Sequence, residues 1–427
     1  MKITRIDAFL LSYPFPKPLL LPYHGGLRKI VKRDAMLIRV ETDKGLIGYA
    51  PGAGSEEAKR QIAGIIAPFC QGHTLADPDA LRIQFFSGPG KDNAELAKVY
   101  CNVEVAFYDL TGQALGLPVS ELIGGRVRDK IALYASAGMY MDPAGYAREA
   151  AQAKEMGFQA YKMRPALGPD KDIETVAKMR EATGFGFGLM VDAHSWWRMG
   201  DKSYTAETVE RVAGAMSAHD ITWLEEPLPP ADHEAYRALR AKDIVPIATG
   251  EHEPDEGGYL DLIHNECAEY IQMDVVCQGG YALGRRIFSA IEQANLRFAF
   301  HSWGTALEVV AAAHLGVCWP ANVVEWLEYP VYSDGRYQFM YEWPLANEIL
   351  TEPLEIVKGD LAVPRAPGLG VKVNEAVIEK YPWIPGPWSY FSIDSPRQTW
   401  AVTADHSVPF VEVASPDTPR KTDVART

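Results

Sequence analysis

Two ionisable residues follow one apolar run in a way that suggests shared chemistry. The stretch FGLMVDAHSWWR, residues 187–198, carries Asp192 at the end of its apolar part and His194 two positions later. Because side chains alternate along an extended strand, these two residues are expected to project to the same side. A carboxylate and an imidazole that face one space can hold a cation or move a proton. How much weight this pair carries depends on whether other strands end in the same way.

Apolar runs with ionisable ends recur through the middle of the chain. From residue 131 onward, eight short apolar runs alternate with amphipathic stretches over about 200 residues. This alternation predicts an α/β fold, a (β/α)8 barrel. Active sites of such barrels lie at the C-terminal ends of the strands, where these side chains would converge. Seven of the eight runs end on an ionisable residue: Lys162, Asp192, Glu225, Glu251, Asp274, His301 and Glu328.

The segments around the barrel complete the expected domain organisation. Residues 1–130 begin with strand-like runs joined by turn signals and continue with helical periodicity, which predicts an α+β capping domain. The barrel is assigned to residues 131–344, and residues 345–380 to a segment that returns to the cap. Residues 381–427 are rich in proline and aromatics and then polar, which predicts an extended tail. We expect its aromatic part to pack on the cap or on a neighbouring subunit.

Composition argues against several other classes of protein. The chain of 427 residues has a net charge of −14 and no basic block, which disfavours nucleic-acid binding. No apolar run reaches the roughly 18–20 residues that span a bilayer, and the start lacks the apolar stretch of a signal peptide. We therefore expect a cytoplasmic protein without membrane association. The five scattered cysteines disfavour a disulfide framework and a thiolate zinc site, and no GxGxxG motif supports a dinucleotide site.

Three carboxylates at successive strand ends indicate a metal site. Asp192, Glu225 and Glu251 would raise one another's pKa values in one cavity unless a cation lay among them. Oxygen ligands alone suit octahedral Mg2+ better than tetrahedral zinc. Any one of these residues is more simply explained as a solvated charge or a surface salt bridge, but the joint pattern favours a metal. Glu226 is expected to point the other way by strand alternation and is assigned no role.

The pattern as a whole resembles the mandelate racemase branch of the enolase superfamily. The resemblance spans nearly all of the chain up to about Tyr381. It implies the capped barrel described above and Mg2+ held by Asp192, Glu225 and Glu251, with the α-proton of a metal-chelated hydroxy acid being removed. The similar motifs are the strand-end carboxylates, EEP at 225–227, GE at 250–251, the pair Asp274 and His301, WLEYP at 326–330, AFYDLTGQALGLPVSELIGG at 106–125 and PGLGVKV at 367–373.

The resemblance also assigns a base. Asp274 and His301 end neighbouring predicted strands, and an adjacent carboxylate fixes the tautomer of an imidazole and raises its basicity. Many family members carry a second base in a Lys-x-Lys motif, where this chain has Lys162, Met163 and Arg164. A guanidinium stays protonated, so Arg164 is a poor base and a good clamp for a carboxylate, while Lys162 could still contribute charge. This departure disfavours racemisation, which needs a base on each face.

His194 narrows the reaction further. Family members that dehydrate sugar acids have a similar Asp-x-His, in which the histidine protonates the departing β-hydroxyl; general acid catalysis of this kind contributes roughly 10^2- to 10^4-fold in rate. A histidine that only hydrogen-bonds a substrate hydroxyl is the alternative. Glu328 resembles the family's eighth-strand glutamate, which bonds the substrate carboxylate, with Glu325 as the competing register.

Candidate substrate contacts lie in the cap and beside two strands. The stretch PYHGGLRK, residues 22–29, has a glycine pair suited to a mobile loop, and the family's equivalent loop covers the barrel mouth. Tyr23, His24 and Arg28 are therefore specificity candidates, although an ordinary surface loop is an alternative. Trp196 and Trp303 could wall the cavity or simply pack beneath a loop.

These interpretations together predict a Mg2+-dependent hydro-lyase. Its substrate would be a small aldonic or aldaric sugar acid, and its product a 2-keto-3-deoxy acid. Two alternatives remain: a racemase or epimerase of a 2-hydroxy acid on the same fold, and a sugar-acid binding protein without turnover. We also expect a homo-oligomer.

Overall fold

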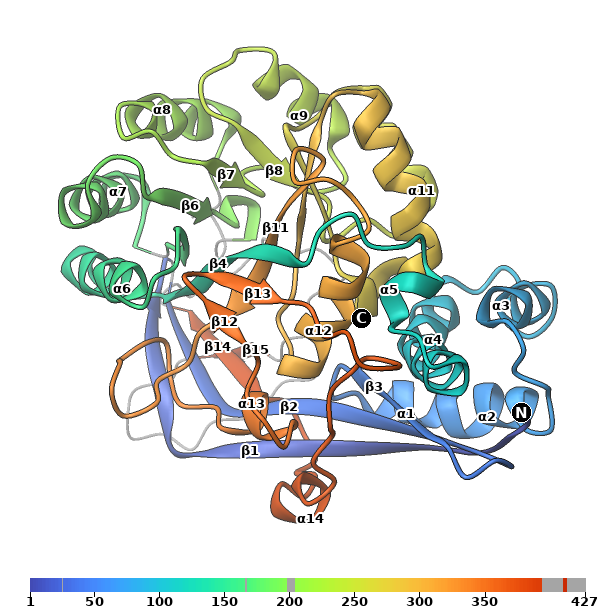
Figure 1. Cartoon of the computed structure of the whole chain (residues 1–427). Coiled ribbons are helices and arrows are strands. Elements are labelled where there is room, and N and C mark those ends of the chain that lie inside the picture. The colour runs from blue at the N-terminus through green and yellow to red at the C-terminus, as the bar shows by residue number, and fades with distance from the viewer. Residues whose placement is uncertain (25, 166, 198–203, 394–409, 413–427) are drawn as a thin grey trace.

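The chain folds as a closed barrel flanked by a cap of one sheet and several helices (Figure 1). The computed structural model describes residues 1–427 except 25, 166, 198–203, 394–409 and 413–427. Adjacent barrel strands pair in parallel, and the last pairs with the first, which closes the ring and confirms the predicted (β/α)8 fold. The strands are β4 (Lys130–Met139), β5 (Ala160–Arg164), β6 (Gly188–Asp192), β7 (Trp223–Glu225), β8 (Ile247–Thr249), β9 (Tyr270–Met273), β10 (Arg297–Phe300) and β11 (Val324–Pro330).

Helices follow the barrel strands and cover the outside of the ring. Several begin at a side-chain cap: Asp142, Asp232 and Asp255 each accept a hydrogen bond from a backbone N–H in the first turn, which satisfies a donor with no partner inside the helix. The caps fix where each strand-to-helix loop ends. The helices are α6 (Pro143–Glu155), α7 (Pro169–Thr183), α8 (Ala206–Ser217), α9 (His233–Arg240), α10 (Glu256–His264), α11 (Gly280–Gln293) and α12 (Ala306–Gly316).

A packed layer of side chains fills the inside of the barrel and places the site above it. Because side chains alternate, residues two positions further along a strand point into the same interior, nearer its C-terminal end. On β6 and β7 these upper positions are Asp192, above Met190, and Glu225, above Trp223. The layer itself is made of Tyr134, Ala160, Met190, Trp223, Ala248, Tyr270 and Ala299.

The sheet of the cap is built on a long hairpin. Strand β1 (Ile3–Tyr23) pairs antiparallel with β2 (Gly26–Thr42), and β3 (Ile47–Gly52) pairs with β2. The sequence favours a mobile loop at residues 22–29, and the structure corrects this: pairing continues to Tyr23 and Gly26, because alternate side chains at the start of β2 are buried. The helical elements of the cap are α1 (Glu56–Gln61), η1 (Ile62–Ile66), α2 (Ala67–Cys70), α3 (Pro78–Phe86), α4 (Ala94–Leu115) and α5 (Val119–Leu122).

The C-terminal part of the chain contacts both the barrel and the cap. Strands β12 (Ile356–Val357) and β13 (Asp360–Ala362) form a hairpin that pairs antiparallel with β4 through β13, and the short helices α13 (Leu345–Glu348) and α14 (Val377–Lys380) flank them in sequence.

The aromatic part of the tail packs on the cap, as predicted. Strand β14 (Ser389–Ile393) pairs antiparallel with β2, and β15 (Phe410–Glu412) pairs with β14. The ring of Trp383 lies 4.3 Å from Lys32 Nζ in β2. From the polar composition of its end, we expect the last ten or so residues of the tail to be dispensable; they lie outside the described residues.

The described cysteines are all free, and four of the five are buried. No helix in the described part of the chain combines the length and the hydrophobicity that crossing a bilayer requires.

Candidate active site

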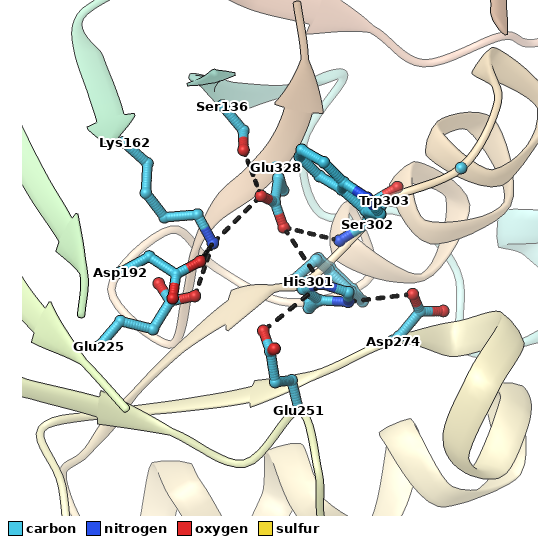
Figure 2. A network of polar contacts seen from close by, with 12 residues as sticks. Ser136, Lys162, Asp192, Glu225, Glu251, Asp274, His301, Ser302, Trp303 and Glu328 are labelled. Atoms are coloured by element: carbon cyan, nitrogen blue, oxygen red, sulfur yellow. Dashed lines mark hydrogen bonds and ion pairs between the residues drawn. The ribbon is translucent and has the colours of Figure 1, made fainter. Parts of the chain in front are cut away.

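Lys162 lies at the centre of a buried group of carboxylates at the barrel mouth (Figure 2). Its Nζ is 2.5 Å from Glu225 Oε1, 3.1 Å from Glu328 Oε1 and 3.4 Å from Asp192 Oδ2. All four side chains are almost completely buried. Burial alone would lower the pKa of Lys162, but these carboxylates outweigh it and raise that pKa. Lys162 is therefore a charged counter-ion for three strand ends rather than a residue of the barrel rim.

Arg164 supplies a second fixed positive charge in the same place. Its Nε lies 3.1 Å from Asp192 Oδ2, and its Nη2 lies 3.0 Å from Glu328 Oε1. The neighbouring carboxylates raise the pKa of Arg164 against the effect of burial. A guanidinium held in this way can orient an anion but cannot accept a proton.

The structure brings Asp274 and His301 together. His301 Nδ1 lies 3.2 Å from Asp274 Oδ2, and Asp274 Oδ1 accepts hydrogen bonds from the backbone N–H groups of Val276 and Cys277 in the π-helix η4 (Val275–Gly279). The other ring nitrogen, Nε2, lies 3.4 Å from Glu251 Oε2. Burial lowers the pKa of His301, but the carboxylates around it, Glu251 above all, raise that pKa to about 10. The imidazole is thus oriented by one carboxylate and turned toward another.

Glu328, rather than Glu325, is the eighth-strand glutamate of the site. Glu328 Oε1 accepts a hydrogen bond from Ser136 Oγ at 2.5 Å, and Oε2 accepts one from the backbone N–H of Ser302 at 3.0 Å. Glu325 Oε2 instead pairs with Arg297. The two glutamates stand three positions apart and so face opposite sides of the strand.

The segments after β6 and β7 correct one sequence prediction. Glu226 was expected to point away from the site, but its φ of 43° breaks the strand alternation. Its Oε2 lies 3.4 Å from His194 Nε2, and its Oε1 lies 2.7 Å from His252 Nδ1. His194 Nδ1 in turn lies 2.5 Å from Asp192 Oδ1. Asp192 raises the pKa of His194 well above its usual range, although burial opposes this.

Comparisons with known proteins agree with this geometry. Residues 145–377 match the family described as Enolase C-terminal domain-like. The chain belongs to the enolase superfamily. Its relatives place it in the mandelate racemase and muconate lactonizing branch, as the sequence motifs indicate.

Two characterised relatives and one solved structure illustrate this membership. The chain is 24% identical to a D-galactarolactone cycloisomerase of Agrobacterium fabrum, over 89% of this chain and 99% of that protein. It is 25% identical to a D-xylonate dehydratase of Haloferax volcanii, over 81% and 85% of the two chains. An enolase-superfamily structure from Polaromonas sp. JS666 superimposes with a TM-score of 0.77 at 27% identity, covering 91% and 99%.

Enolase-superfamily enzymes use a divalent metal, typically Mg2+, and the side chains at this barrel mouth fit one. One ligand atom each from His194, Glu226 and Glu251 lies within 4.8 Å of the others. Glu226 Oε2 and Glu251 Oε2 are buried and accept no hydrogen bond from the described residues. An imidazole nitrogen, of His194 or His301, lies 3.4 Å from each, and both oxygens remain suitable ligands for a hard cation. Glu225 differs, because its oxygens contact Lys162 and the Trp223 indole N–H. The structure thus places Glu226 beside Glu251 as a candidate metal ligand, whereas the sequence predicts Glu225 in that role.

The tip of the β1–β2 hairpin lies over the barrel mouth. The His24 ring adjoins Gly168 after β5, and its centre is 6.0 Å from that of Tyr204. Arg28 is buried and donates from Nη1 to Tyr140 Oη at 2.9 Å. The Tyr140 backbone N–H in turn donates to the Arg164 carbonyl at 3.4 Å. His24 and Arg28 thus lie near residues that follow β5 and β4, and their role in specificity stays a prediction. The Tyr23 side chain lies outside the described residues.

The two candidate tryptophans both adjoin ionisable residues of the mouth. The Trp303 ring centre lies 3.9 Å from the Arg164 guanidinium carbon. Trp196 is buried, with its ring centre 6.2 Å from that of His194 and 5.7 Å from that of His252. The sequence analysis did not single out His252. Its position directly after the candidate ligand Glu251 is the signal that could have identified it.

The burial of Lys162 leads to a stability prediction. Changing Lys162 to Met leaves Asp192, Glu225 and Glu328 without the cation that all three contact, and removing one partner of a buried ion pair typically costs about 3–5 kcal/mol. We expect the free energy of unfolding in EDTA, measured with urea, to fall by about 3 kcal/mol. Lys171→Met, at an exposed helix pair, is the matched control and should change stability little. Equal stability of the two variants would contradict the counter-ion role.

Proposed function

We propose that this protein is a Mg2+-dependent dehydratase of an aldonic or aldaric acid, which removes the α-proton and the β-hydroxyl to give a 2-keto-3-deoxy acid. One observation carries the proposal: two imidazoles flank the two oxygens of Glu251. His301 Nε2 lies 3.4 Å from Oε2, and His194 Nε2 lies 3.6 Å from Oε1. A base and an acid that face one space can act on neighbouring carbons of one substrate. Relatives that are sugar-acid dehydratases support the same class.

The base in this mechanism is His301. Its Nε2 takes the α-proton while Asp274 holds Nδ1 and stabilises the imidazolium that forms. In this role His301 acts in its neutral form, with Asp274 fixing the tautomer that leaves Nε2 free to accept the proton. Arg164 cannot serve as a base on the other face, which disfavours the racemase and epimerase alternative.

The acid in this mechanism is His194. Its Nε2 gives a proton to the departing β-hydroxyl, so the C–O bond breaks with loss of water, and the resulting enol becomes the 2-keto acid. Asp192 holds the opposite nitrogen, Nδ1. Because Asp192 raises the pKa of His194, the ring carries the proton that the leaving group needs.

The remaining groups hold the substrate carboxylate and the charge that develops on it. We propose that Asp192, Glu225 and Glu251 bind Mg2+, which when bound supplies positive charge at the substrate carboxylate and α-hydroxyl. Arg164 and Lys162 supply fixed positive charge beside Glu328. Glu328 is the proposed hydrogen-bond partner of the substrate carboxylate.

Cycloisomerisation of a sugar lactone is a second candidate. The observation that favours it is the match to the cycloisomerase of Agrobacterium fabrum over 99% of that protein. Such a reaction could use the same base, and His194 would protonate a ring oxygen instead of a hydroxyl. The two candidates differ in substrate and not in the proposed roles of the histidines.

A substrate screen tests the proposal. Purified protein with Mg2+ is incubated with a library of aldonic acids, aldaric acids and their lactones, and 2-keto acid formation is measured. We expect one or a few open-chain acids to be dehydrated. Conversion of lactones alone would favour the cycloisomerase, α-epimers without 2-keto acid would favour the epimerase, and binding without any product would favour the binding protein.

A further inference from the structure

The C-terminal segment 383–389 reaches the barrel mouth from the side of the cap. The Trp388 carbonyl accepts hydrogen bonds from the backbone N–H groups of Val31 and Lys32, at 2.9 and 3.4 Å. The pairing of β14 with β2 begins at the next residue, Ser389. The segment is therefore anchored on the strand that carries the cap residues nearest the site.

The Trp388 indole lies against two guanidinium groups of β2. Its ring centre is 4.6 Å from the Arg28 guanidinium carbon and 5.2 Å from that of Arg33. Guanidinium groups stack well on indole faces, and such contacts are stronger where water is excluded. Both arginines are about 5% exposed, so Trp388 forms part of a dry surface around them.

Arg33 also contacts the barrel, at Trp303, which follows β10. Its Nη2 donates to the Trp303 carbonyl at 3.0 Å, and its guanidinium carbon lies 5.3 Å from the Trp303 ring centre. Trp343 and Tyr341 lie on other sides, at 4.7 and 6.0 Å. Within the described part of the chain no carboxylate forms an ion pair with Arg33. Aromatic rings and one carbonyl are therefore its main described contacts.

Trp303 also lies among the residues of the candidate active site, as Figure 2 shows. Its ring stacks on Arg164 at 3.9 Å, and its backbone N–H donates to Glu308 Oε1 at 3.0 Å. Arg164 in turn contacts Asp192 and Glu328. Rings and guanidinium groups thus alternate without a gap from Trp388 to the carboxylates of the site.

We propose that Trp388 and Arg33 are positioning residues, and that the segment 383–389 braces the active site through Trp303 and Arg164. The inference rests on the proposed function for its effect on catalysis, because Arg164 there orients the substrate carboxylate. The physical reason is preorganisation: a displacement of about 1 Å at a catalytic group can cost about 10^2-fold in rate. The C-terminal segment then belongs to the active site although it lies outside the barrel.

The test compares two tryptophans of the same segment. Trp388→Ala removes the ring beside Arg33, whereas Trp383→Ala removes a ring that contacts Lys32 and Glu56 and serves as the matched control. In holoenzyme with Mg2+ we expect Trp388→Ala and Arg33→Met to lower kcat/KM for the best acid of the screen about tenfold or more. Trp383→Ala should stay within about twofold, and Trp388→Phe, which keeps a ring, should retain most of the activity.

Hydrogen–deuterium exchange supplies a readout that does not need turnover. The peptide that covers residues 301–308 should exchange faster in Trp388→Ala than in Trp383→Ala, because Arg33, which contacts the Trp303 carbonyl and ring, loses the Trp388 ring that packs against it. Equal exchange in the two variants would overturn the brace, whether or not any sugar acid is converted. If the enzyme is active, equal kcat/KM values for Trp388→Ala and Trp383→Ala would also overturn the bracing role of the segment. A wild-type protein that converts no acid would instead count against the proposed function.

Discussion

His301→Asn is expected to abolish dehydration and, with it, exchange of the substrate α-proton in heavy water. Asparagine can occupy the space beside Asp274, but it cannot take the proton that His301 Nε2 is placed to accept. General base catalysis is typically worth 10^2- to 10^4-fold, so we expect a loss of at least about 10^3-fold in both reactions. Proton NMR in heavy water follows the exchange, and a 2-keto acid assay follows the dehydration.

His194→Asn should separate the two reactions. If His194 protonates the leaving hydroxyl, its loss impairs dehydration by roughly 10^2-fold or more while some α-proton exchange persists. Arg164→Met is the companion variant: it should weaken binding or rate without stopping exchange, because a guanidinium cannot be the base. Normal exchange in His301→Asn together with none in Arg164→Met or Lys162→Met would place the base on β5 and revive the epimerase alternative.

The barrel and the strand-end positions could be predicted because both follow from local patterns. Each of the eight apolar runs overlaps a strand of the ring, and parallel strands in a closed barrel must bring their C-terminal ends to one mouth. The contact of His301 with Asp274 follows from strand order. His194 does contact Asp192 as expected, but β6 ends at Asp192 and His194 has a φ of 43°, so strand alternation is not the cause of that contact. Strand ends and strand order are properties of neighbouring residues and strands, which a sequence carries directly.

The contacts that were missed depend on backbone geometry or on distant pairing. The positive φ of Glu226 turns its side chain to His194 and His252, and glutamate carries no signal for that conformation. The extension of the hairpin through residues 22–29 depends on burial against other parts of the chain. Trp388 contacts Arg33 because β14 pairs with β2, a strand that lies hundreds of residues earlier in the chain. The composition of the tail predicts that its aromatic residues pack against something, but it does not indicate which residues they contact.

Removing the divalent metal is expected to abolish turnover, and adding Mg2+ should restore it. Four buried carboxylates, those of Asp192, Glu225, Glu226 and Glu251, lie at this mouth, and they repel one another unless a cation lies among them. A binding readout is independent of activity: after EDTA treatment, Mg2+ at a hundred times its Kd should stabilise the folded protein by about 2.7 kcal/mol. Full activity in metal-free protein would exclude this role.

Two adjacent glutamates decide which carboxylates hold the ion. If Asp192, Glu225 and Glu251 are the ligands, Glu225→Gln should lose most of the Mg2+-dependent stabilisation and Glu226→Gln should keep it. The opposite result would assign the ion to the cluster of Glu226, His194 and Glu251, whose ligand atoms already lie within 4.8 Å of one another. Glu325→Gln, on the same barrel but paired with Arg297, is the control and should respond to Mg2+ like the wild type. Glu225 contacts Lys162 in this structure, so it would have to give up that ion pair to bind the metal. Glu226 Oε2 accepts no hydrogen bond from the described residues and would not have to give one up. The comparison of the two variants therefore shows which of these neighbouring glutamates is the metal ligand.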